Sequence, residues 1–281
     1  GDGSAEKLSA AIQREGWASW ATVMQLGRNG GFSFGNNAGI RMALTATEPA
    51  AHLLLLNPDT IVRAGAVKAL VRFMAAHPQA GIAGSQLENA DGGTDSSAHT
   101  FPSSLSELDA GARLGVLSRF LHPYVVTPSA TRDRPHLCDW VSGASMMIRS
   151  QVIADIGCMD EDFFLYFEEV DFCRRAQLAG WECWYVPDSR VVHLEGASTG
   201  IRVSSRRRAG YWYDSRRRFF VKHYGIAGLI AADTLRAIGR LSFVLRKGLH
   251  LCANRDTNDP RWFMFDLLWG DLAAIVTGRV R

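Results

Sequence analysis

The sequence predicts an α/β protein with a mostly parallel sheet flanked by helices. Short apolar runs indicate buried strands at 21–26, 52–56 and 80–85, and residues 64–77 between the last two have helical periodicity. Strands that alternate with helices in this way form parallel, doubly wound sheets. The composition is that of an ordinary soluble protein, because 47% of the 281 residues are hydrophobic and 21% are charged.

The second half of the chain resumes this alternation after a long interruption. Residues 86–136 are rich in Gly, Ser, Asp and Pro, which predicts a surface excursion such as a flexible lid. We expect strands at 140–149, 182–187 and 190–194 and a helix at 168–180. From about residue 224, apolar residues recur at helical spacing with Arg and Lys between them, which predicts an amphipathic helix lying against a surface.

Charge and cysteine content narrow the class of protein. The net charge of +3 argues against a nucleic-acid-binding protein. The five cysteines are scattered without CxxC spacing, which argues against a disulfide framework and a zinc site and favours the cytoplasm. No stretch approaches the roughly 20 apolar residues that cross a bilayer. A basic stretch is expected either to attract phosphates or an anionic membrane or to be an ordinary solvated helix: Arg202, Arg206, Arg207, Arg208, Arg216, Arg217, Arg218 and Lys222.

The first candidate site is LLLLNPDT, in which an apolar strand ends at Asn57, Pro58 and Asp59. Ligands of open α/β sheets bind beyond the carboxyl ends of the strands, so we expect Asp59 at the binding edge. A carboxylate there can hold Mg²⁺ or Mn²⁺, which prefer oxygen ligands and often share coordination with a diphosphate. The alternative is a turn in which Asp59 caps the following helix.

The second candidate is the Gly-rich segment GRNGGFSFGNNAGI at 27–40. Its glycines and the adjacent Asn36 and Asn37 leave amide donors close together, as a nucleotide or phosphate pocket requires, and a helix is expected from about residue 36. The segment is neither GxGxxG after a strand nor a Walker loop, so an ordinary loop is the alternative.

The third candidate is FFLYFEEVDFCRR at 163–175, where Glu168, Glu169 and Asp171 follow a run of aromatic residues. Acids in the first turn of a helix are favoured by its dipole, which is the structural explanation. Glu168 and Asp171 share a helix face, whereas Glu169 is rotated about a quarter turn away. Carboxyl groups this close raise one another's pKa, and a raised pKa is one way to make a general base.

A histidine at a strand end is the fourth candidate. His193 follows the apolar residues of VVHLEGAST. Such a residue is often structural, but at the end of a strand it can also ligate a divalent ion or bind a diphosphate.

Taken in order, these stretches resemble the family 2 glycosyltransferases of the GT-A fold, particularly the rhamnosyltransferase-like branch. The resemblance covers most of residues 2–224. It is carried by DGSAEKL, NGGFSFGNNAGI, LLLLNPDT, the stretch from WVSGASMMIR to HLEGAST, and YWYDSRRRFFVKHYG. The resemblance implies transfer of a sugar, with inversion, from a nucleotide-diphosphate donor to an acceptor hydroxyl, usually with Mg²⁺ or Mn²⁺ bound.

The resemblance also implies roles for individual positions. Asp59 matches the metal-binding acid of a DxD-type motif, with Asn57 in place of the usual first acid, and His193 completes the metal and diphosphate site. Glu169 matches the catalytic base, with Glu168 and Asp171 as the other candidates. The remaining residues implied at the donor site are Asn29, Gly31, Phe32, Asn36, Asn37, Gly143 and Ala144. Those implied at an acceptor, phosphate or membrane surface are Trp140, Arg206, Arg207, Arg216 and Arg217.

Relatives in this family begin with a strand and an acidic strand end that hold the nucleotide base, and continue through a second strand into DGSAEKL. Because nothing comparable precedes Gly1, we expect an N-terminally truncated GT-A domain over residues 1–223. We expect residues 224–281 to be a helical extension that can associate with a membrane.

The implied function is that of an inverting glycosyltransferase that moves a sugar, with rhamnose suggested by the resemblance, to a saccharide or polyprenyl-diphosphate-linked acceptor. The expected setting is bacterial cell-surface polysaccharide synthesis, in the cytoplasm or peripherally on the inner face of the membrane. Two alternatives stay open at this point. One is a nucleotidyltransferase, which also combines an α/β sheet with metal-binding acids. The other is a non-catalytic relative that keeps only the fold or an acceptor or membrane surface.

Overall fold

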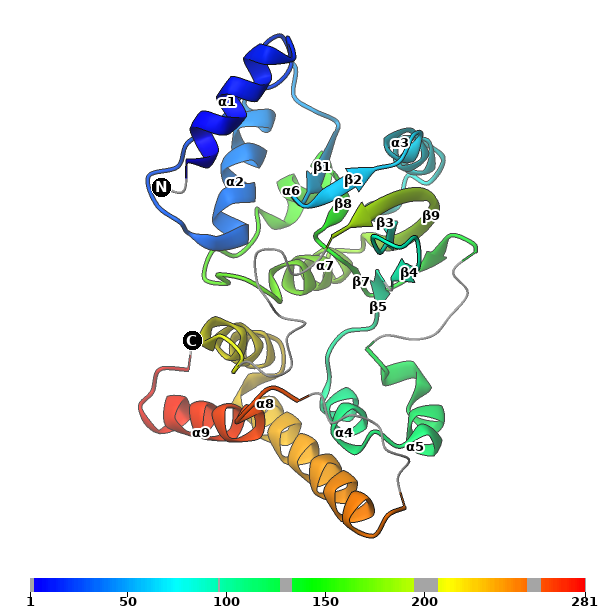
Figure 1. Ribbon diagram of the computed structural model, residues 1–281, viewed down its shortest axis with the longest axis vertical. Coiled ribbons are helices and arrows are strands. Elements are labelled where there is room, and N and C mark those ends of the chain that lie inside the picture. Colours follow the sequence, from blue (N-terminus) through cyan, green and yellow to red (C-terminus); the bar gives the residue numbers. More distant parts are fainter. Residues whose placement is uncertain (1–2, 96, 127–132, 195–206, 252–258, 281) are drawn as a thin grey trace.

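The computed structural model describes residues 3–95, 97–126, 133–194, 207–251 and 259–280. These residues form a sheet with helices on both faces and, beside it, a group of helices that includes the C-terminal part of the chain (Figure 1). The α/β class with flanking helices is therefore confirmed.

The main sheet has the strand order β1-β8-β3-β9-β2, with β4 beside β3 and β6 beside β9. The two longest strands, β3 and β9, are parallel, and β1 runs in the same direction. The reversed strand β8 separates β1 from β3, so its pairings with both are antiparallel, as are the short pairings of β2, β4 and β6. The expected common direction thus holds for β1, β3 and β9. The bounds are β1 His52–Leu56, β2 Thr60–Val62, β3 Ala80–Glu88, β4 Thr94–Asp95, β6 His136–Leu137, β8 Ser145–Arg149 and β9 Glu182–His193.

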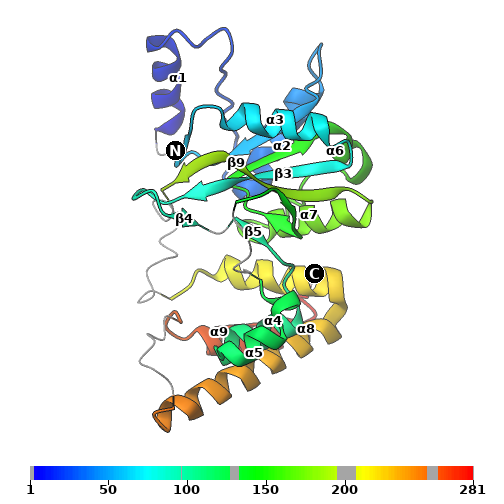
Figure 2. The same cartoon turned by 90° about the vertical axis from the view of Figure 1, so that its right-hand side faces the viewer.

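Alternate side chains along the strands pack against helices on opposite faces of the sheet. Ala83 and Met147 face α3 (Ala66–Ala76), whose Leu70 and Met74 pack on them. Their neighbours Ile82, Met146 and Ile148 face the opposite layer of α2 (Gly31–Leu44), α6 (Ser150–Ile156) and α7 (Glu168–Leu178). Figure 2 shows α3 on one side of the sheet and α7 on the other. Burial on both faces explains why the first part of β3, residues 80–84, has no polar side chain.

Two predictions about the first third of the chain are corrected. Residues 21–26 form neither helix nor strand, because none of their side chains is buried and no strand lies beside them in the described residues. The helix expected from about residue 36 begins earlier, with α2 starting at Gly31. The preceding helix, α1 (Ser4–Arg14), buries none of its residues.

The described residues of the segment 86–136 include short helices and strands, and the flexible lid expected there stays a prediction. After β5 (Ala98–His99), which pairs with β7 (Trp140–Val141), the segment forms α4 (Ser104–Ala112), α5 (Gly115–Phe120) and η1 (His122–Tyr124). Helix α4 packs closely on α8 because glycines occupy the crossing. A Cβ on Gly111 would lie 2.5 Å from the Arg236 carbonyl oxygen, and one on Gly239 would lie 2.5 Å from that of Leu108.

The C-terminal helices are α8 (Gly210–Gly248) and α9 (Phe263–Val276). Helix α8 bends at Gly225, whose φ of 70° and ψ of 179° are not helical, and this bend lies next to the boundary expected at 223/224. Phe219 and Phe220 before the bend and Leu229 after it pack with Phe163 from the sheet layer. Within the described residues, no helix is both long and apolar enough to cross a membrane.

Candidate active site

The ends of β1 and β9 bring together the first and fourth candidates. The chain turns after β1 and returns as β2, which places Thr60 opposite His193 in the ladder. As a result the Asp59 Oδ1 lies 3.4 Å from His193 Nε2, and the Asn57 amide nitrogen lies 3.3 Å from the same atom. Helix α3 starts at Ala66 with Gly65 before it, so Asp59 does not cap that helix.

A glycine loop connects this pair to the third candidate. The Asn57 N–H donates to the Ala144 carbonyl at 3.0 Å, which fixes the loop against the end of β1. The neighbouring Gly143 lies between Phe32 and Glu169. A Cβ on Gly143 would lie 2.9 Å from the Phe32 ring and 3.8 Å from the Glu169 Cβ. Contacts therefore run without a break from His193 through this loop to Glu169.

The first turn of α7 carries two carboxyl groups with raised pKa values. Burial raises the pKa of Glu169 to about 7, although hydrogen bonds from backbone N–H groups, including that of Gly143, favour its ionised form. Burial, and then the charge of Glu169, raise the pKa of Glu168 well above its usual range. An Oε2 of each has no hydrogen-bond partner in the described part of the chain. Glu168 is 3% exposed, whereas Glu169 keeps more of its surface accessible.

Asp171 has the opposite environment. It is fully buried and accepts hydrogen bonds from Arg175 Nε at 2.9 Å and His223 Nε2 at 2.9 Å, and Lys222 Nζ lies 2.7 Å away. Burial acts to raise its pKa, but the bonds from His223, Lys222 and Arg175 outweigh burial and hold the pKa well below its usual range. The Asp171 carboxylate therefore has a structural role, because its bonds to Lys222 and His223 connect α7 to α8.

The aromatic residues before α7 form a strained turn that aims Glu168 and Glu169. Tyr166 and Phe167 have φ values of 71° and 67°, in the left-handed region that side chains with a Cβ rarely adopt. The start of α2 holds this turn in place, because the Phe32 N–H donates to the Phe164 carbonyl at 2.9 Å. Gly31 allows the approach, since a Cβ there would lie 1.9 Å from the Phe164 oxygen. Such strain persists only where the surroundings over-determine it.

The asparagines of the Gly-rich segment form hydrogen bonds with the protein's own backbone, and the donor-binding role expected of Asn29 and Asn36 stays a prediction. Asn29 Oδ1 accepts from the Gly31 N–H at 3.1 Å, and Asn36 donates to the Phe32 carbonyl at 2.9 Å. Asn37 is fully buried, donates to the Met159 carbonyl at 2.8 Å and accepts from the Met159 N–H at 3.0 Å. Its amide is thus used within the fold and is not available to a ligand.

The basic stretch is also used inside the protein, which corrects the surface role expected of Arg216 and Arg217. The Arg216 side chain is 1% exposed and pairs with Glu107, Asp233 and Asp271 at 2.8–3.1 Å. Arg217 pairs with Asp271 at 2.7 Å, and Arg207 pairs with Asp266. Arg206 lies outside the described residues. Sequence reasoning missed the three acids around Arg216, although two of them, Asp233 and Asp271, interrupt the apolar periodicity of α8 and α9 and were a visible signal.

Trp140 lies at the start of β7. Its ring stacks on His99 with centroids 4.1 Å apart, and its Nε1 donates to the Thr100 carbonyl at 3.0 Å. These contacts fix the ring beside the loop that contains Gly143, where the expected contact with an acceptor stays a prediction.

Asp59 and His193 together offer two suitable ligands for a divalent cation. They offer a carboxylate oxygen and an imidazole nitrogen within 3.4 Å of each other, with the Asn57 amide adjacent. Among the described residues, no group of three or more His, Cys, Asp or Glu side chains could hold a metal. The described residues therefore supply only part of a coordination shell, and a diphosphate has the oxygens to complete it.

An acid, a histidine and two carboxyl groups with raised pKa values thus lie along a strand-end edge of an α/β sheet, which is where ligands of such sheets bind. The comparison with protein families identifies the class of protein. Residues 15–212 match the model of glycosyltransferase-like family 2, and the chain belongs to this family. The predicted family is thus confirmed.

Two curated proteins illustrate the similarity. The chain is 32% identical over 152 residues to the N-acetylglucosaminyl-diphospho-decaprenol L-rhamnosyltransferase of Mycobacterium tuberculosis, a match that covers 53% of this chain and 48% of that protein. It is 26% identical over 169 residues to rhamnosyltransferase WbbL of Escherichia coli, covering 58% and 60%. The chain spans about half the length of the first relative.

Among solved structures, the chain is similar to the crystal structure of GalNAc-T7 with UDP, GalNAc and Mn²⁺. The TM-score is 0.53 at 16% sequence identity, and the match covers 99% of this chain and 49% of that one. A similarity at this level of identity concerns the fold alone, and it supports the GT-A fold expected from the sequence.

Proposed function

We propose that the chain is the catalytic part of an inverting glycosyltransferase that moves a sugar from a nucleotide-diphosphate donor to a polyprenyl-diphosphate-linked or saccharide acceptor in glycan synthesis. The observation that carries the proposal is the unbroken line of contacts from His193 and Asp59 through Gly143 to Glu169. These contacts support the proposal, because they join the pair assigned to the diphosphate to a carboxyl group with a raised pKa.

Asp59 and His193 are assigned to the donor side. Mg²⁺ or Mn²⁺ held there would neutralise the negative charge that develops on the departing nucleoside diphosphate. With Asn57 in place of a second acid, the described residues contribute one carboxylate to this site, so the metal would be held weakly until the diphosphate arrives.

Glu169 is assigned as the general base. The acceptor oxygen bonds to the anomeric carbon as the bond from that carbon to the diphosphate breaks, and the hydroxyl proton passes to the Glu169 carboxylate. A pKa of about 7 suits this step, because a base works best when its pKa lies near the working pH. Asp171 is unsuited to it, since its carboxylate is buried and bonded to Arg175, Lys222 and His223.

Rhamnose is proposed as the sugar and a polyprenyl diphosphate as the acceptor carrier. The support is that the similar proteins of M. tuberculosis and E. coli are both named rhamnosyltransferases, and that the name of one includes diphospho-decaprenol. A reaction with such an acceptor would take place at the cytoplasmic face of the membrane.

The test is to replace Glu169 with Gln and to measure both donor binding and transfer. Calorimetric titration with UDP and dTDP, with and without Mn²⁺, should give metal-dependent binding that E169Q leaves intact. Turnover should fall by about 10²–10⁴-fold in E169Q, since the variant keeps the shape but cannot accept a proton. Glu6→Gln, on an exposed helix with no buried residues, is the matched control.

Three outcomes would contradict the proposal. E169Q with near-normal turnover would remove Glu169 as the base. A folded protein that binds neither nucleotide would indicate a non-catalytic relative. Release of pyrophosphate, with a nucleotide transferred to the acceptor, would indicate a nucleotidyltransferase.

A further inference from the structure

The second half of α8 and the whole of α9 expose a set of large apolar side chains. Leu241 and Leu245 on α8 and Leu249 at its C-cap recur at helical spacing, and Phe265, Trp269 and Leu272 do so on α9. We call these six residues the apolar face, and each of them is 52–68% exposed. Single exposed apolar residues are ordinary, whereas a set on two neighbouring helices marks an interaction surface.

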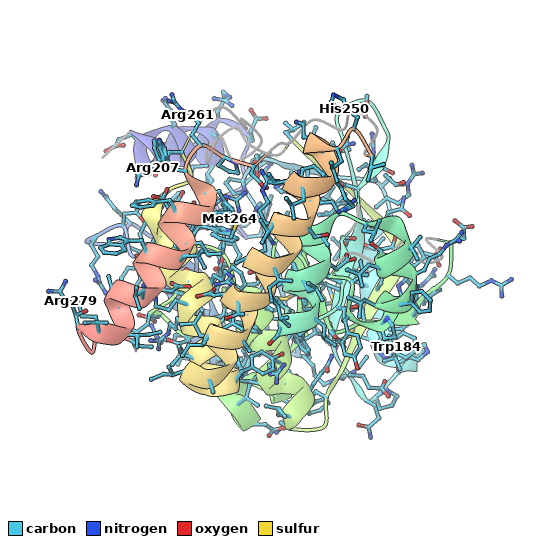
Figure 3. The ribbon with its side chains drawn as sticks, turned by 90° about the horizontal axis from the view of Figure 1, so that it is seen from below. Trp184, Arg207, His250, Arg261, Met264 and Arg279 are labelled. Atoms are coloured by element: carbon cyan, nitrogen blue, oxygen red, sulfur yellow. The ribbon has the colours of Figure 1, made fainter. Side chains whose placement is uncertain are left out.

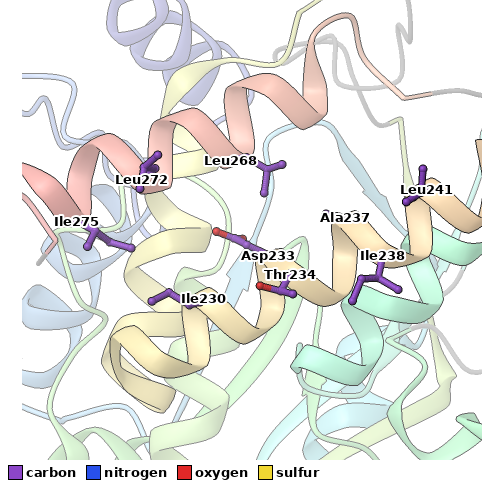
Figure 4. A pocket seen from close by; sticks show the side chains of 9 residues that line it. All are labelled: Ile230, Asp233, Thr234, Ala237, Ile238, Leu241, Leu268, Leu272 and Ile275. Carbon is purple, nitrogen blue, oxygen red and sulfur yellow. The ribbon is translucent and has the colours of Figure 1, made fainter.

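A groove between the two helices continues this face. It encloses about 430 Å³, and Ile230, Ile238 and Leu241 line one side while Leu268, Leu272 and Ile275 line the other (Figure 4). Leu241 and Leu272 belong to both the groove and the apolar face, so the two form one surface. The groove has the apolar lining and the open form that a hydrocarbon chain requires.

The charges around this surface are distributed unevenly. The acids that the structure describes here are neutralised within the protein, because Asp233 and Asp271 pair with Arg216, Asp266 with Arg207, and Asp259 with Arg113 and Arg240. Exposed cations remain at the helix ends: Lys247 on α8, Arg261 just before α9 and Arg279 just after it. No ion pair joins these three to an acid in the described ranges. Figure 3 shows Arg261 and Arg279 at the two ends of α9.

An apolar surface with cations at its rim and its acids neutralised complements an anionic lipid bilayer. Large apolar side chains enter the boundary between headgroups and acyl chains, and lysine and arginine at the rim attract anionic headgroups. A second copy of the chain fits less well, since it would bring the same cations to the same rim. The helices would lie on the bilayer, because none of the described helices can cross it.

We propose that the apolar face docks on an anionic lipid bilayer and that the α8–α9 groove takes up a lipid hydrocarbon chain. Phe265 and Trp269, whose rings stack with centroids 6.3 Å apart, form the part of the face that enters the headgroup region. This inference stands on the helices alone. It adds to the proposed function a means of bringing the enzyme to a lipid-linked acceptor.

The test is flotation of the full chain with vesicles of phosphatidylcholine alone and with added phosphatidylglycerol. The protein should float with the anionic vesicles, and high salt should weaken this binding because the rim charges are screened. Leu245→Glu and Trp269→Glu should each lower the partition coefficient by about tenfold or more, since each places a charge in the lipid contact. Leu178→Glu, at a 76% exposed position at the end of α7, is the matched control and should float like the original protein.

Lys247→Gln and Arg261→Gln should weaken binding to the anionic vesicles and leave any binding to phosphatidylcholine unchanged. Thermal melting of each variant verifies that it is folded. The proposal would be overturned if the folded original protein stayed with neither vesicle, or if L245E and W269E floated normally. It would also be overturned if sedimentation velocity showed a dimer that these two variants dissociate. Transfer to a water-soluble acceptor tests the glycosyltransferase proposal separately, because that reaction needs no bilayer.

Discussion

Glu169 and Asp171 are two residues apart on one helix, yet their surroundings move their pKa values in opposite directions. Burial raises the pKa of Glu169 to about 7, whereas hydrogen bonds from His223, Lys222 and Arg175 outweigh burial at Asp171 and lower its pKa. The sequence FEEVD could not separate these cases, because His223 and Lys222 are about 50 residues further along the chain. The partners therefore decide which acid is free to exchange a proton.

The raised pKa of Glu169 predicts the pH dependence of catalysis. A general base acts as the carboxylate, and a group with a pKa of about 7 is protonated below that pH. The kcat/KM for transfer should therefore rise with pH and level off above an apparent pKa of about 7. Initial rates at subsaturating substrate from about pH 5 to pH 9 measure this profile. A profile that is flat down to pH 5 would show that Glu169 ionises normally or is not the base.

Among the elements, the contact between α4 and α8 depends on two glycines. Gly111 and Gly239 face each other's helix backbone, and a side chain on either would meet a carbonyl oxygen of the other helix at 2.5 Å. Backbone atoms cannot rotate away as a flexible side chain can. A methyl group at this crossing must therefore move one helix relative to the other.

Gly239→Ala should accordingly destabilise the protein by about 1–3 kcal/mol, although alanine is by itself the better helix former. Urea unfolding of the variant and the original protein gives the difference in the free energy of unfolding. Gly35→Ala in α2 is the control, because nothing lies within 4 Å of its Cβ position. It should be neutral or stabilise by up to about 1 kcal/mol. Equal stability of G239A and the original protein would mean that the two helices have room for a methyl group between them.

Sequence patterns predicted those elements whose own residues contain the signal. The strands β1 and β3 and the helices α3 and α7 have clear apolar periodicity and lie where expected. The prediction of a strand at 21–26 was wrong, because an apolar run forms a strand only where a partner strand lies beside it. Helix α2 was placed too late because its first turn is rich in glycine, and its start depends on contact with Phe164, more than 130 positions away.

The residues of the candidate site were likewise predicted correctly only where the signal lay in the neighbouring sequence. A residue at a strand end could be predicted from the strand, so the expected association of Asp59 with His193 appears as a 3.4 Å contact. Asn37 and Arg216 were assigned to ligands because their partners are remote. Asn37 bonds a residue 122 positions away, and Arg216 bonds Glu107 from 109 positions away. A polar side chain whose hydrogen-bond partner lies far along the chain cannot be distinguished, in the sequence, from one that is available to a ligand.

For the whole molecule, the sheet layer and the C-terminal helices share a core. Phe163 and Val170 pack with Phe219 and Phe220 before the bend in α8, and with Leu229 after it. The buried Arg216 finds two of its three acid partners, Asp233 and Asp271, beyond residue 223. The chain thus changes direction near the proposed boundary at 223/224, but the hydrophobic packing and the ion pairs continue across it.

Removal of residues 224–281 should therefore destabilise the rest of the chain severely. It would expose the Phe163 and Phe220 side chains and leave Arg216 buried with a single acid, and loss of a partner from a buried ion pair alone costs about 3–5 kcal/mol. Thermal melting and solubility of residues 1–223 measure the effect. Removal of residues 1–14 is the control, because α1 has no buried residues. A shortened chain 1–223 that melts like the original protein would establish residues 1–223 as an independent domain.

The Arg216 cluster also limits how this chain can exchange parts with its relatives. A recombination event at residue 224 that brought in helices lacking acids at the positions of Asp233 and Asp271 would leave a guanidinium group enclosed without its counter-charges. Inheritance of the three residues is therefore linked: Arg216 and its two acids must be kept together or replaced together. The C-terminal helices are in this sense not a transferable module, even though they follow the proposed catalytic residues in the sequence.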